Sequence, residues 1–232
     1  MASIGHPVLV DDDPNDRDQR RPTLVLVTGL PGTGKSTVAG ATAEVLGAAV
    51  LGHDWAMSGL RPYQELQDVL NAMEPSGHRV VGWSILNALA AAQLRAGRSV
   101  VLDGVARPSE IAAGRGTAQR EDSRMVMIAT QCSDRALHRS RIEGRQRSIP
   151  NWYEVGWSSV ERSLDMWEQP EGAELYLDAA DPLGRQCRRA GVTFQPSGGA
   201  VMIARDRRPS GKPPRRRMLC HEKARLTPRK VG

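Results

Sequence analysis

Aromatic residues and cysteines are both scarce in this chain of 232 residues. Aromatics make up 4% of the sequence, and the three cysteines are Cys132, Cys187 and Cys220. The cysteines are widely spaced, odd in number and include no C-x-x-C pair, so the sequence indicates neither a disulfide framework nor a thiolate metal site. This pattern is typical of a reducing compartment, and we expect a cytoplasmic protein.

A recognisable leader and a membrane-spanning stretch are also lacking. Residues 1–22 carry five aspartates where a signal peptide needs a basic segment followed by an apolar one. The longest near-apolar run, residues 85–94, contains Asn87 and Gln93. It has about half of the ~20 residues that a membrane span requires. We therefore expect no membrane partner.

Positive charge is spread unevenly along the chain. The net charge is +6, yet residues 204–232 hold 11 Lys/Arg against two acidic residues, which leaves residues 1–203 with a net charge of −3. A uniformly basic domain that coats nucleic acid is thereby disfavoured. The composition predicts a disordered acidic segment at residues 1–21, a folded domain at 22–185 and a largely disordered basic tail at 186–232. For the tail we expect weak, salt-sensitive contact with polyanions, or plain solvation as the alternative.

Short apolar runs alternate with helical patterns along the folded part. The apolar runs lie at residues 23–28, 48–51, 99–102, 124–130 and 174–177, and their length and composition are typical of strands buried on both faces. The helical patterns lie at residues 35–46, 63–73, 80–96, 109–120, 134–143 and 155–168. In the third pattern Val81, Ile85 and Leu89 recur at a spacing of four. This alternation predicts an α/β fold with a five-stranded, mostly parallel sheet and helices on both faces.

A glycine-rich loop with a specific spacing follows the first apolar run. Residues 29–37 read GLPGTGKST and match the phosphate-binding pattern G-x-x-x-x-G-K-[ST]. Glycines allow consecutive N–H groups to surround phosphate oxygens, and the next helix directs its positive dipole end at them. The candidate nucleotide-binding residues are Gly29, Pro31, Gly32, Thr33, Gly34, Lys35, Ser36 and Thr37.

Two residues of this loop carry most of the expected chemistry. Lys35 places a cation on the phosphates, and the Ser36 hydroxyl is a candidate ligand for Mg²⁺. Lys35 is the only lysine before Lys212, in a chain that otherwise uses arginine. A lysine kept at this position favours a phosphate-binding loop over an ordinary glycine turn.

Asp103 directly follows the apolar run that ends at Leu102, which is the arrangement of a Walker B strand. Such a carboxylate holds Mg²⁺, usually through water, so Asp103 is the second candidate metal ligand. A substrate contact or an ordinary turn residue are the alternatives.

Taken together, these segments resemble the P-loop small-molecule kinases. The resemblance rests on GLPGTGKST, on HDW after the second apolar run, on VVLDG at the third and on an arginine-rich helix after the fourth. The group includes gluconate kinase, chloramphenicol phosphotransferase, polynucleotide kinase domains, zeta-toxin-like kinases and a bacterial set known as predicted kinases or ATP-binding proteins. Over residues 23–180 the resemblance implies a P-loop NTPase three-layer sandwich with an Arg-rich lid, and ATP and Mg²⁺ as cofactors.

The resemblance also implies roles for three charged residues. Asp54 matches the position at which similar kinases have an aspartate that accepts or orients the proton of the acceptor hydroxyl; a helix N-cap is the alternative. Arg141 and Arg145 are candidates for the lid arginines that close over the transferred phosphate, with Arg139 and Arg147 less favoured. A solvated charged helix is the competing interpretation for these arginines.

The few aromatics gather near these positions. Val160, Leu164 and Trp167 recur at helical spacing and predict a core face. For Trp152 and Tyr153 two interpretations stay open: core packing, or an acceptor pocket in which they stack on a flat ligand. Trp55, Arg61 and Tyr63 are candidates for the opposite wall of that pocket, whereas His53 is interpreted as a structural histidine.

The sequence as a whole predicts an ATP-dependent phosphotransferase, monomeric or dimeric, that acts on a hydroxyl of a small molecule. The acceptor stays open among antibiotics, sugars, nucleosides and polynucleotide 5′-hydroxyls. A P-loop ATPase or nucleotide-dependent switch is the main alternative, and a polyanion-binding module that works through the tail is another.

Overall fold

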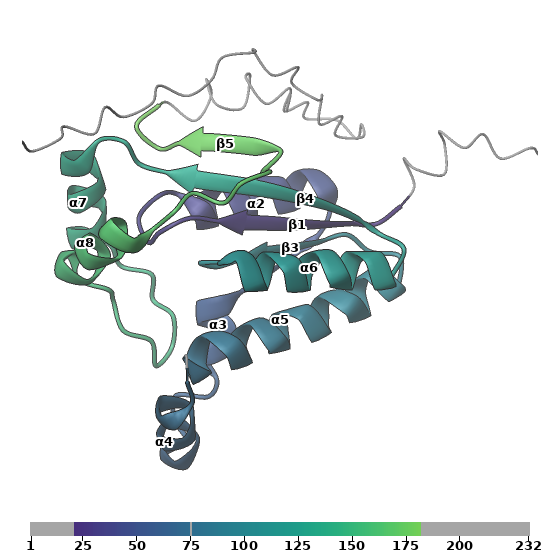
Figure 1. The fold of residues 1–232 in the computed structure, drawn as a ribbon, viewed down its shortest axis with the longest axis horizontal. Helices are drawn as coiled ribbons and strands as arrows, with labels where there is room; N and C mark the ends of the chain where they lie inside the picture. The colour runs from purple at the N-terminus through teal and green to yellow at the C-terminus, as the bar shows by residue number, and fades with distance from the viewer. Residues whose placement is uncertain (1–20, 75, 182–232) are drawn as a thin grey trace, which may run out of the picture.

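The computed structural model describes residues 21–74 and 76–181. The predictions made for residues 1–20, for the basic tail and for the end of the domain at 185 lie outside the described residues. Figure 1 shows a central sheet with helices on both sides.

Five parallel strands form this sheet. They are β1 (Thr23–Thr28), β2 (Ala49–Gly52), β3 (Val100–Asp103), β4 (Arg124–Gln131) and β5 (Leu175–Asp178). Their order is β2-β3-β1-β4-β5, with every neighbouring pair parallel. Each predicted apolar run matches one strand to within a residue at either end, so the predicted sheet is confirmed.

Helices cover both faces of the sheet, which confirms the predicted three-layer fold. They are α2 (Lys35–Leu46), α3 (His53–Ser58), α4 (Gln64–Ala72), α5 (Gly77–Arg95), α6 (Pro108–Arg120), α7 (Arg135–Glu143) and α8 (Trp157–Met166). Helix α2 lies on one face, and α5 and α6 lie on the other (Figure 1). The chain leaves β1 for β2 on one side and later returns to β4 on the other. In sheets of this kind ligands bind at the carboxyl ends of the strands beside such a reversal.

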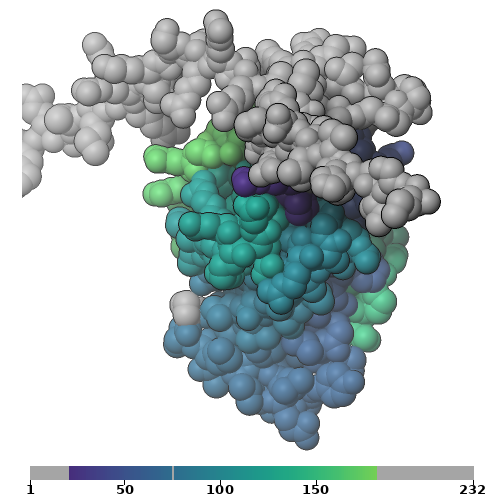
Figure 2. All heavy atoms as spheres, turned by 90° about the vertical axis from the view of Figure 1, so that its right-hand side faces the viewer, coloured from purple at the N-terminus to yellow at the C-terminus, as the bar shows by residue number. Residues whose placement is uncertain are grey.

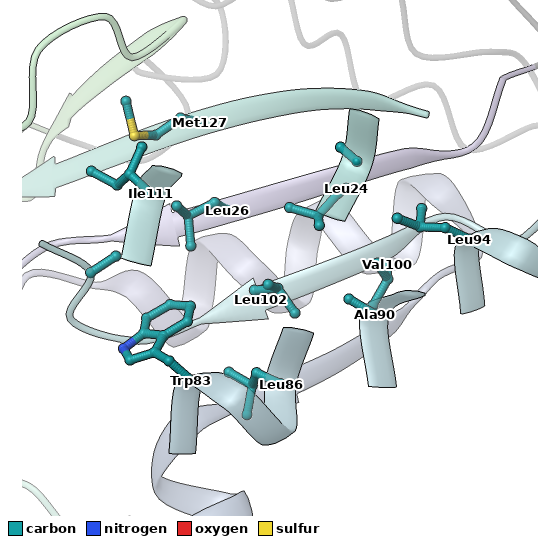
Figure 3. Packing of buried hydrophobic residues seen from close by; sticks show 12 residues of the cluster. Leu24, Leu26, Trp83, Leu86, Ala90, Leu94, Val100, Leu102, Ile111 and Met127 are labelled. Carbon is teal, nitrogen blue, oxygen red and sulfur yellow. The ribbon is translucent and has the colours of Figure 1, made fainter. Parts of the chain in front are cut away.

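Alternating residues of β1 supply two separate hydrophobic layers, because successive side chains of a strand point to opposite faces. Val25 and Val27 pack with Val38 of α2. On the other face Leu24 and Leu26 pack with the buried side of α5 (Figure 3). All four β1 side chains are at most 1% exposed. Burying each is worth roughly 1.5–3 kcal/mol, which holds the carboxyl end of β1 in place.

The buried face of α5 differs from the one that the sequence spacing suggests. Leu89, which shares a stripe with Val81 and Ile85, is 47% exposed, and the buried face holds Trp83, Leu86, Ala90 and Leu94. Since α5 carries apolar residues around most of its circumference, spacing alone does not select the face that packs. The six-residue helix α3 was not predicted either, because it is too short to show a helical period.

The end of the molecule built from α4 and the start of α5 projects away from the sheet (Figure 1) and forms the lower, blue region of Figure 2. Leu70 and Gln67 of α4 are buried, whereas most of its other residues are exposed. The connection between α7 and α8 lies on the side of α3 that faces away from α5, and it reaches down towards α4 in Figure 1.

Candidate functional site

The glycine-rich loop connects β1 directly to α2, as the sequence predicts. Gly29 has φ of 146°, and a Cβ there would lie 2.2 Å from the Thr130 carbonyl oxygen. At Gly32, where φ is 83°, a Cβ would lie 2.8 Å from Cδ1 of Ile142 in α7. Both positions therefore require glycine, for backbone conformation and for close packing.

Buried hydroxyl groups support the loop from below. The Thr33 hydroxyl donates to the Leu30 carbonyl at 2.7 Å and lies 2.7 Å from the Thr130 hydroxyl. Thr130 Oγ1 is in turn 3.1 Å from the Thr28 carbonyl, and Thr28 Oγ1 accepts from the Ala106 N–H at 2.9 Å. Thr28 and Thr130 had not been identified from the sequence, since isolated threonines in apolar runs carry no signal of their own.

His138 joins the loop to α7. It is 1% exposed, and its Nε2 lies 2.7 Å from the Pro31 carbonyl oxygen, which can only accept, so Nε2 carries the proton. The ring also meets the edge of Trp157 at 5.4 Å between centroids. Sequence reasoning missed this histidine, which fixes the outer side of the loop against α7 and α8.

Lys35 is buried at the start of α2, and its Nζ donates to the Leu30 carbonyl at 2.9 Å. Burial lowers the pKa of Lys35 to about 8, with Asp103 opposing the shift and Arg145 adding to it. The ammonium group is still charged at neutral pH, but it lacks a directly bonded carboxylate in the described chain. An anion beside it would raise its pKa again.

A cavity of about 560 Å³ opens beside the loop and brings half of the predicted site residues together. Its lining comes from the loop, α2, β2 with α3, the end of β3, and the connection between α7 and α8. The lining residues are Pro31, Lys35, Ser36, Gly40, Val50, Gly52, His53, Asp54, Trp55, Asp103, Gly104, Val105, Arg145, Arg147, Ile149, Trp152, Tyr153 and Val155.

Asp54 lies in the first turn of α3, and the N-cap of that helix is Gly52, so the N-cap interpretation of Asp54 does not hold. Its carboxylate pairs with Arg147 and lies 3.6 Å from Nδ1 of His53. Burial by itself would raise the pKa of Asp54, but the hydrogen bonds from His53 and Arg147 outweigh it and hold this pKa at about 2. Asp54 is therefore ionised across the neutral range.

Arg147 connects Asp54 to the opposite wall of the cavity. Its backbone N–H and its Nε donate to the two carboxylate oxygens of Glu154, at 2.8 and 3.1 Å, and its Nη2 donates to the Tyr153 carbonyl at 3.1 Å. The sequence had favoured Arg147 less than Arg145. The available signal was the Arg-x-Arg spacing of residues 145 and 147, because in extended backbone residues i and i+2 lie on the same side.

Arg145 is half-buried in the cavity, and within residues 21–74 and 76–181 its guanidinium has no hydrogen bond or ion pair. Burial and the charge of Arg147 lower the pKa of Arg145 from its ordinary value. A guanidinium remains charged at neutral pH even so. The structure thus holds a partly desolvated cation next to Lys35 with no carboxylate bound to it.

The other arginines of this region lie elsewhere. Arg141, predicted together with Arg145, does not line the cavity, and its Nη2 donates to the Ala179 carbonyl at 3.0 Å beyond β5. Arg139 pairs with Glu143 one helical turn away, and Arg135 pairs with Glu161 of α8. Helical periodicity directs these side chains to the outside of α7, whereas Arg145 lies past its end.

Aromatic side chains line the part of the cavity that α3 and the connection between α7 and α8 form. Trp152 and Tyr153 are stacked, with 5.2 Å between ring centroids and 22° between ring planes. The Arg61 guanidinium lies 5.8 Å from the centroid of Trp152 and 5.4 Å from that of Tyr153. Trp55 lines the cavity from α3, whereas Tyr63 is exposed and does not.

Ser36 and Asp103 are the oxygen donors at the phosphate end of the cavity. A hydroxyl and a carboxylate suit a hard cation such as Mg²⁺, so these two residues fit the predicted metal. The described residues contain no cluster of three or more His, Cys, Asp or Glu side chains that would form a complete protein cage for a metal. A site with two protein donors leaves room for water and phosphate oxygens.

A sequence profile for the family described as AAA domain matches residues 24–170, and the chain belongs to that family. Among proteins of curated function, none matches the chain in sequence. Within the described residues, no helix is long and apolar enough to cross a membrane.

Two kinases are among the solved structures that share the fold. A gluconokinase from Sinorhizobium meliloti 1021 is 20% identical, with a TM-score of 0.52, and the match covers 73% of this chain and 89% of that one. A sugar kinase from Janibacter sp. HTCC2649 is 17% identical, with a TM-score of 0.51 and coverage of 73% and 92%. The predicted resemblance to the P-loop small-molecule kinases is confirmed at the level of the fold.

Proposed function

We propose that the protein is an ATP-dependent phosphotransferase that moves the γ-phosphoryl group of ATP to a hydroxyl of a small molecule. The proposal rests on the arrangement of charge around one cavity. Above all, it is supported by Arg145, a half-buried cation without a partner in the described chain that lines the same cavity as the buried Lys35. Two desolvated cations next to a glycine-rich loop favour a polyphosphate ligand.

In this proposal the loop and Lys35 hold the β- and γ-phosphates. Ser36 and Asp103 would hold Mg²⁺, which would neutralise charge on the phosphate oxygens. Arg145 contacts the γ-phosphoryl group, where negative charge is spread over the equatorial oxygens in the transition state. The function of Arg141 in this scheme would require a movement of α7, because its guanidinium binds Ala179.

Asp54 receives the acceptor hydroxyl. A bond forms between the acceptor oxygen and the γ-phosphorus, the bond from that phosphorus to the β–γ bridging oxygen breaks, and ADP leaves with the electron pair. The hydroxyl proton passes to Asp54 or through it to water. Since the pKa of Asp54 is about 2, its carboxylate accepts a hydrogen bond from the substrate hydroxyl and thereby orients that hydroxyl before transfer.

Turnover assays with and without hydroxyl acceptors test the proposal. Phosphorylated product should form only with an acceptor present, and Arg145→Ala should reduce its formation by roughly 100-fold or more. Arg139→Ala is the matched control, because Arg139 is exposed and paired with Glu143. ATP hydrolysis at the same rate with and without every acceptor would instead support the ATPase or switch.

A further inference from the structure

The acceptor end of the cavity is apolar and open to solvent. Trp55 is 57% exposed, Tyr153 is 56% exposed and Val50 is 41% exposed, and all three line the same cavity. Ile149 and Val155 add further apolar surface there. Single exposed apolar side chains need no explanation, but several around one concave site indicate a surface that binds a ligand.

Trp152 and Tyr153 are held in position without a ligand. They stack on each other, and Arg61, in the segment between α3 and α4, lies over both rings. Arg61 is itself oriented by a hydrogen bond from Nη1 to Gln67 Oε1 at 3.2 Å. Because these rings are ordered in advance, a ligand that stacks on them loses less conformational entropy in binding.

The charged groups that line the cavity leave no cation free for an acidic acceptor. Arg61, which is outside the lining, is held by Gln67 Oε1 and by the faces of Trp152 and Tyr153. Arg147 forms ion pairs with Asp54 and Glu154. Lys35 donates a hydrogen bond to the Leu30 carbonyl and is attracted by the negative charge of Asp103. Within the part of the chain that the structure describes, Arg145 is the one cationic side chain of the lining without a partner, and the proposed function assigns it to the transferred phosphate. An acceptor carboxylate would also lie close to the ionised Asp54, which would repel it.

We propose that the acceptor is an uncharged hydroxyl compound with a planar ring, which stacks on Trp152, Tyr153 and Trp55 while its hydroxyl reaches Asp54. This inference rests on the proposed phosphotransferase function and adds the class of its substrate. Aromatic contacts of this kind are worth about 0.5–1.5 kcal/mol beyond the area they bury, which is roughly two- to twelvefold in affinity.

Three classes of acceptor test the inference with the full-length protein. Uridine and 1-phenyl-1,2-ethanediol carry a ring and no charge, ribitol and glycerol carry hydroxyls without an aromatic ring, and gluconate carries a carboxylate. We expect kcat/KM for the first class to exceed the values for the other two by at least about tenfold.

Tyr153→Leu and Tyr63→Leu form a matched pair, because the two tyrosines are 56% and 57% exposed and only Tyr153 lines the cavity. Tyr153→Leu should raise KM for ring-bearing acceptors about two- to twelvefold, with KM for ATP unchanged, and Tyr63→Leu should change neither. An unchanged KM for ATP also reports that the variant is folded.

Transfer mainly to polyols or gluconate, with Tyr153→Leu indistinguishable from Tyr63→Leu, would overturn this inference and leave the proposed function intact. Transfer to none of the three classes would count against both. ATP hydrolysis at a rate that no acceptor changes would contradict the proposed phosphotransferase function itself. The assays therefore distinguish a wrong acceptor class from a wrong function.

Discussion

The glycine-rich loop and the connection at residues 144–156 face the same cavity, yet different interactions hold them. The loop is supported by the buried hydroxyls of Thr33, Thr130 and Thr28 and by His138, which are 0–4% exposed. The connection is held by Arg147, whose partners Asp54 and Glu154 have side chains that are 38% and 39% exposed.

This difference has consequences for how each side responds to a ligand. Buried hydrogen bonds are costly to break, because the groups left behind have no water to bind. Arg147 itself is 13% exposed, and ion pairs with a partly exposed carboxylate contribute modestly to net stability and weaken with salt. We infer that the phosphate side is the more rigid of the two, and that the connection at residues 144–156 can adjust its position when a ligand binds while Arg147 keeps its partners.

Lys35→Met should have the largest effect and abolish phosphoryl transfer. Methionine fills the buried volume of the side chain but removes the charge that faces the phosphates. Nucleotide titration and turnover measure the loss, and an unfolding curve checks that the variant is folded. Wild-type affinity and turnover in this variant would show that the loop does not bind phosphate.

Asp54→Asn should keep nucleotide binding and reduce transfer by roughly 100-fold or more. In the wild type the pKa of Asp54 is about 2, against an ordinary value of 3.8. The ionised carboxylate therefore stabilises the fold at pH values above 3.8, and this contribution to stability is lost as the pH falls towards 2. Protonation of Asp54 should slow phosphoryl transfer only when the pH also falls towards 2. If Asp54→Asn transfers phosphate at a near-normal rate, the pair of Asp54 and Arg147 is structural only.

Binding of nucleotide should take up protons at mildly alkaline pH. The pKa of Lys35 is about 8 in the free protein, and bound phosphate raises it, so between the two values binding adds a proton and affinity falls as the pH rises. Calorimetry in buffers of different ionisation enthalpy measures the uptake at about pH 8.5. Lys35→Met should remove it, and an uptake that persists in the variant would assign it to another group.

The glycine-rich loop depends on local backbone geometry, and it was predicted well from the sequence. The connection at residues 144–156 depends on long-range contacts, and it was predicted less well. The spacing of glycines, Lys35 and Ser36 in GLPGTGKST fixes the loop locally, and the five apolar runs fix the sheet. Asp54 and Asp103 could be placed because both lie at the carboxyl ends of strands, Asp54 just after β2 and Asp103 at the end of β3, and these ends meet at one edge of the sheet.

The arginines show where local reasoning fails. Arg141 lies on a regular helix and reaches Ala179, whereas Arg147 lies in a connection without a period and meets Asp54, 93 residues earlier. His138 and Thr130 are similar cases, because their partners in the loop are about 100 residues away in the chain. Such pairings depend on how α7 and β4 pack against β1, which no local pattern encodes.

Thr33→Val should have an intermediate effect and test the buried side of the comparison. The substitution removes the hydroxyl between the Leu30 carbonyl and Thr130 and should destabilise the fold by about 1–3 kcal/mol. Nucleotide affinity should fall along with stability, since the same groups shape the loop. Thr42→Val on α2, outside the loop, is the control. Equal losses of stability and nucleotide affinity in both variants would show that the Thr33 contacts contribute nothing particular to the loop.

Glu154→Gln should have the smallest effect, because it alters the exposed side. The amide of glutamine can still accept from Arg147, and an exposed ion pair is worth at most about 1 kcal/mol, so KM for the acceptor should change less than about fivefold. The salt dependence of that KM should weaken, as one charge of the pair is gone. Glu143→Gln is the control, since Glu143 pairs with Arg139 on the outer face of α7 and should change neither quantity. If Glu154→Gln impairs transfer more than Thr33→Val does, the connection at residues 144–156 is a rigid part of the site, and the contrast between its two sides is wrong.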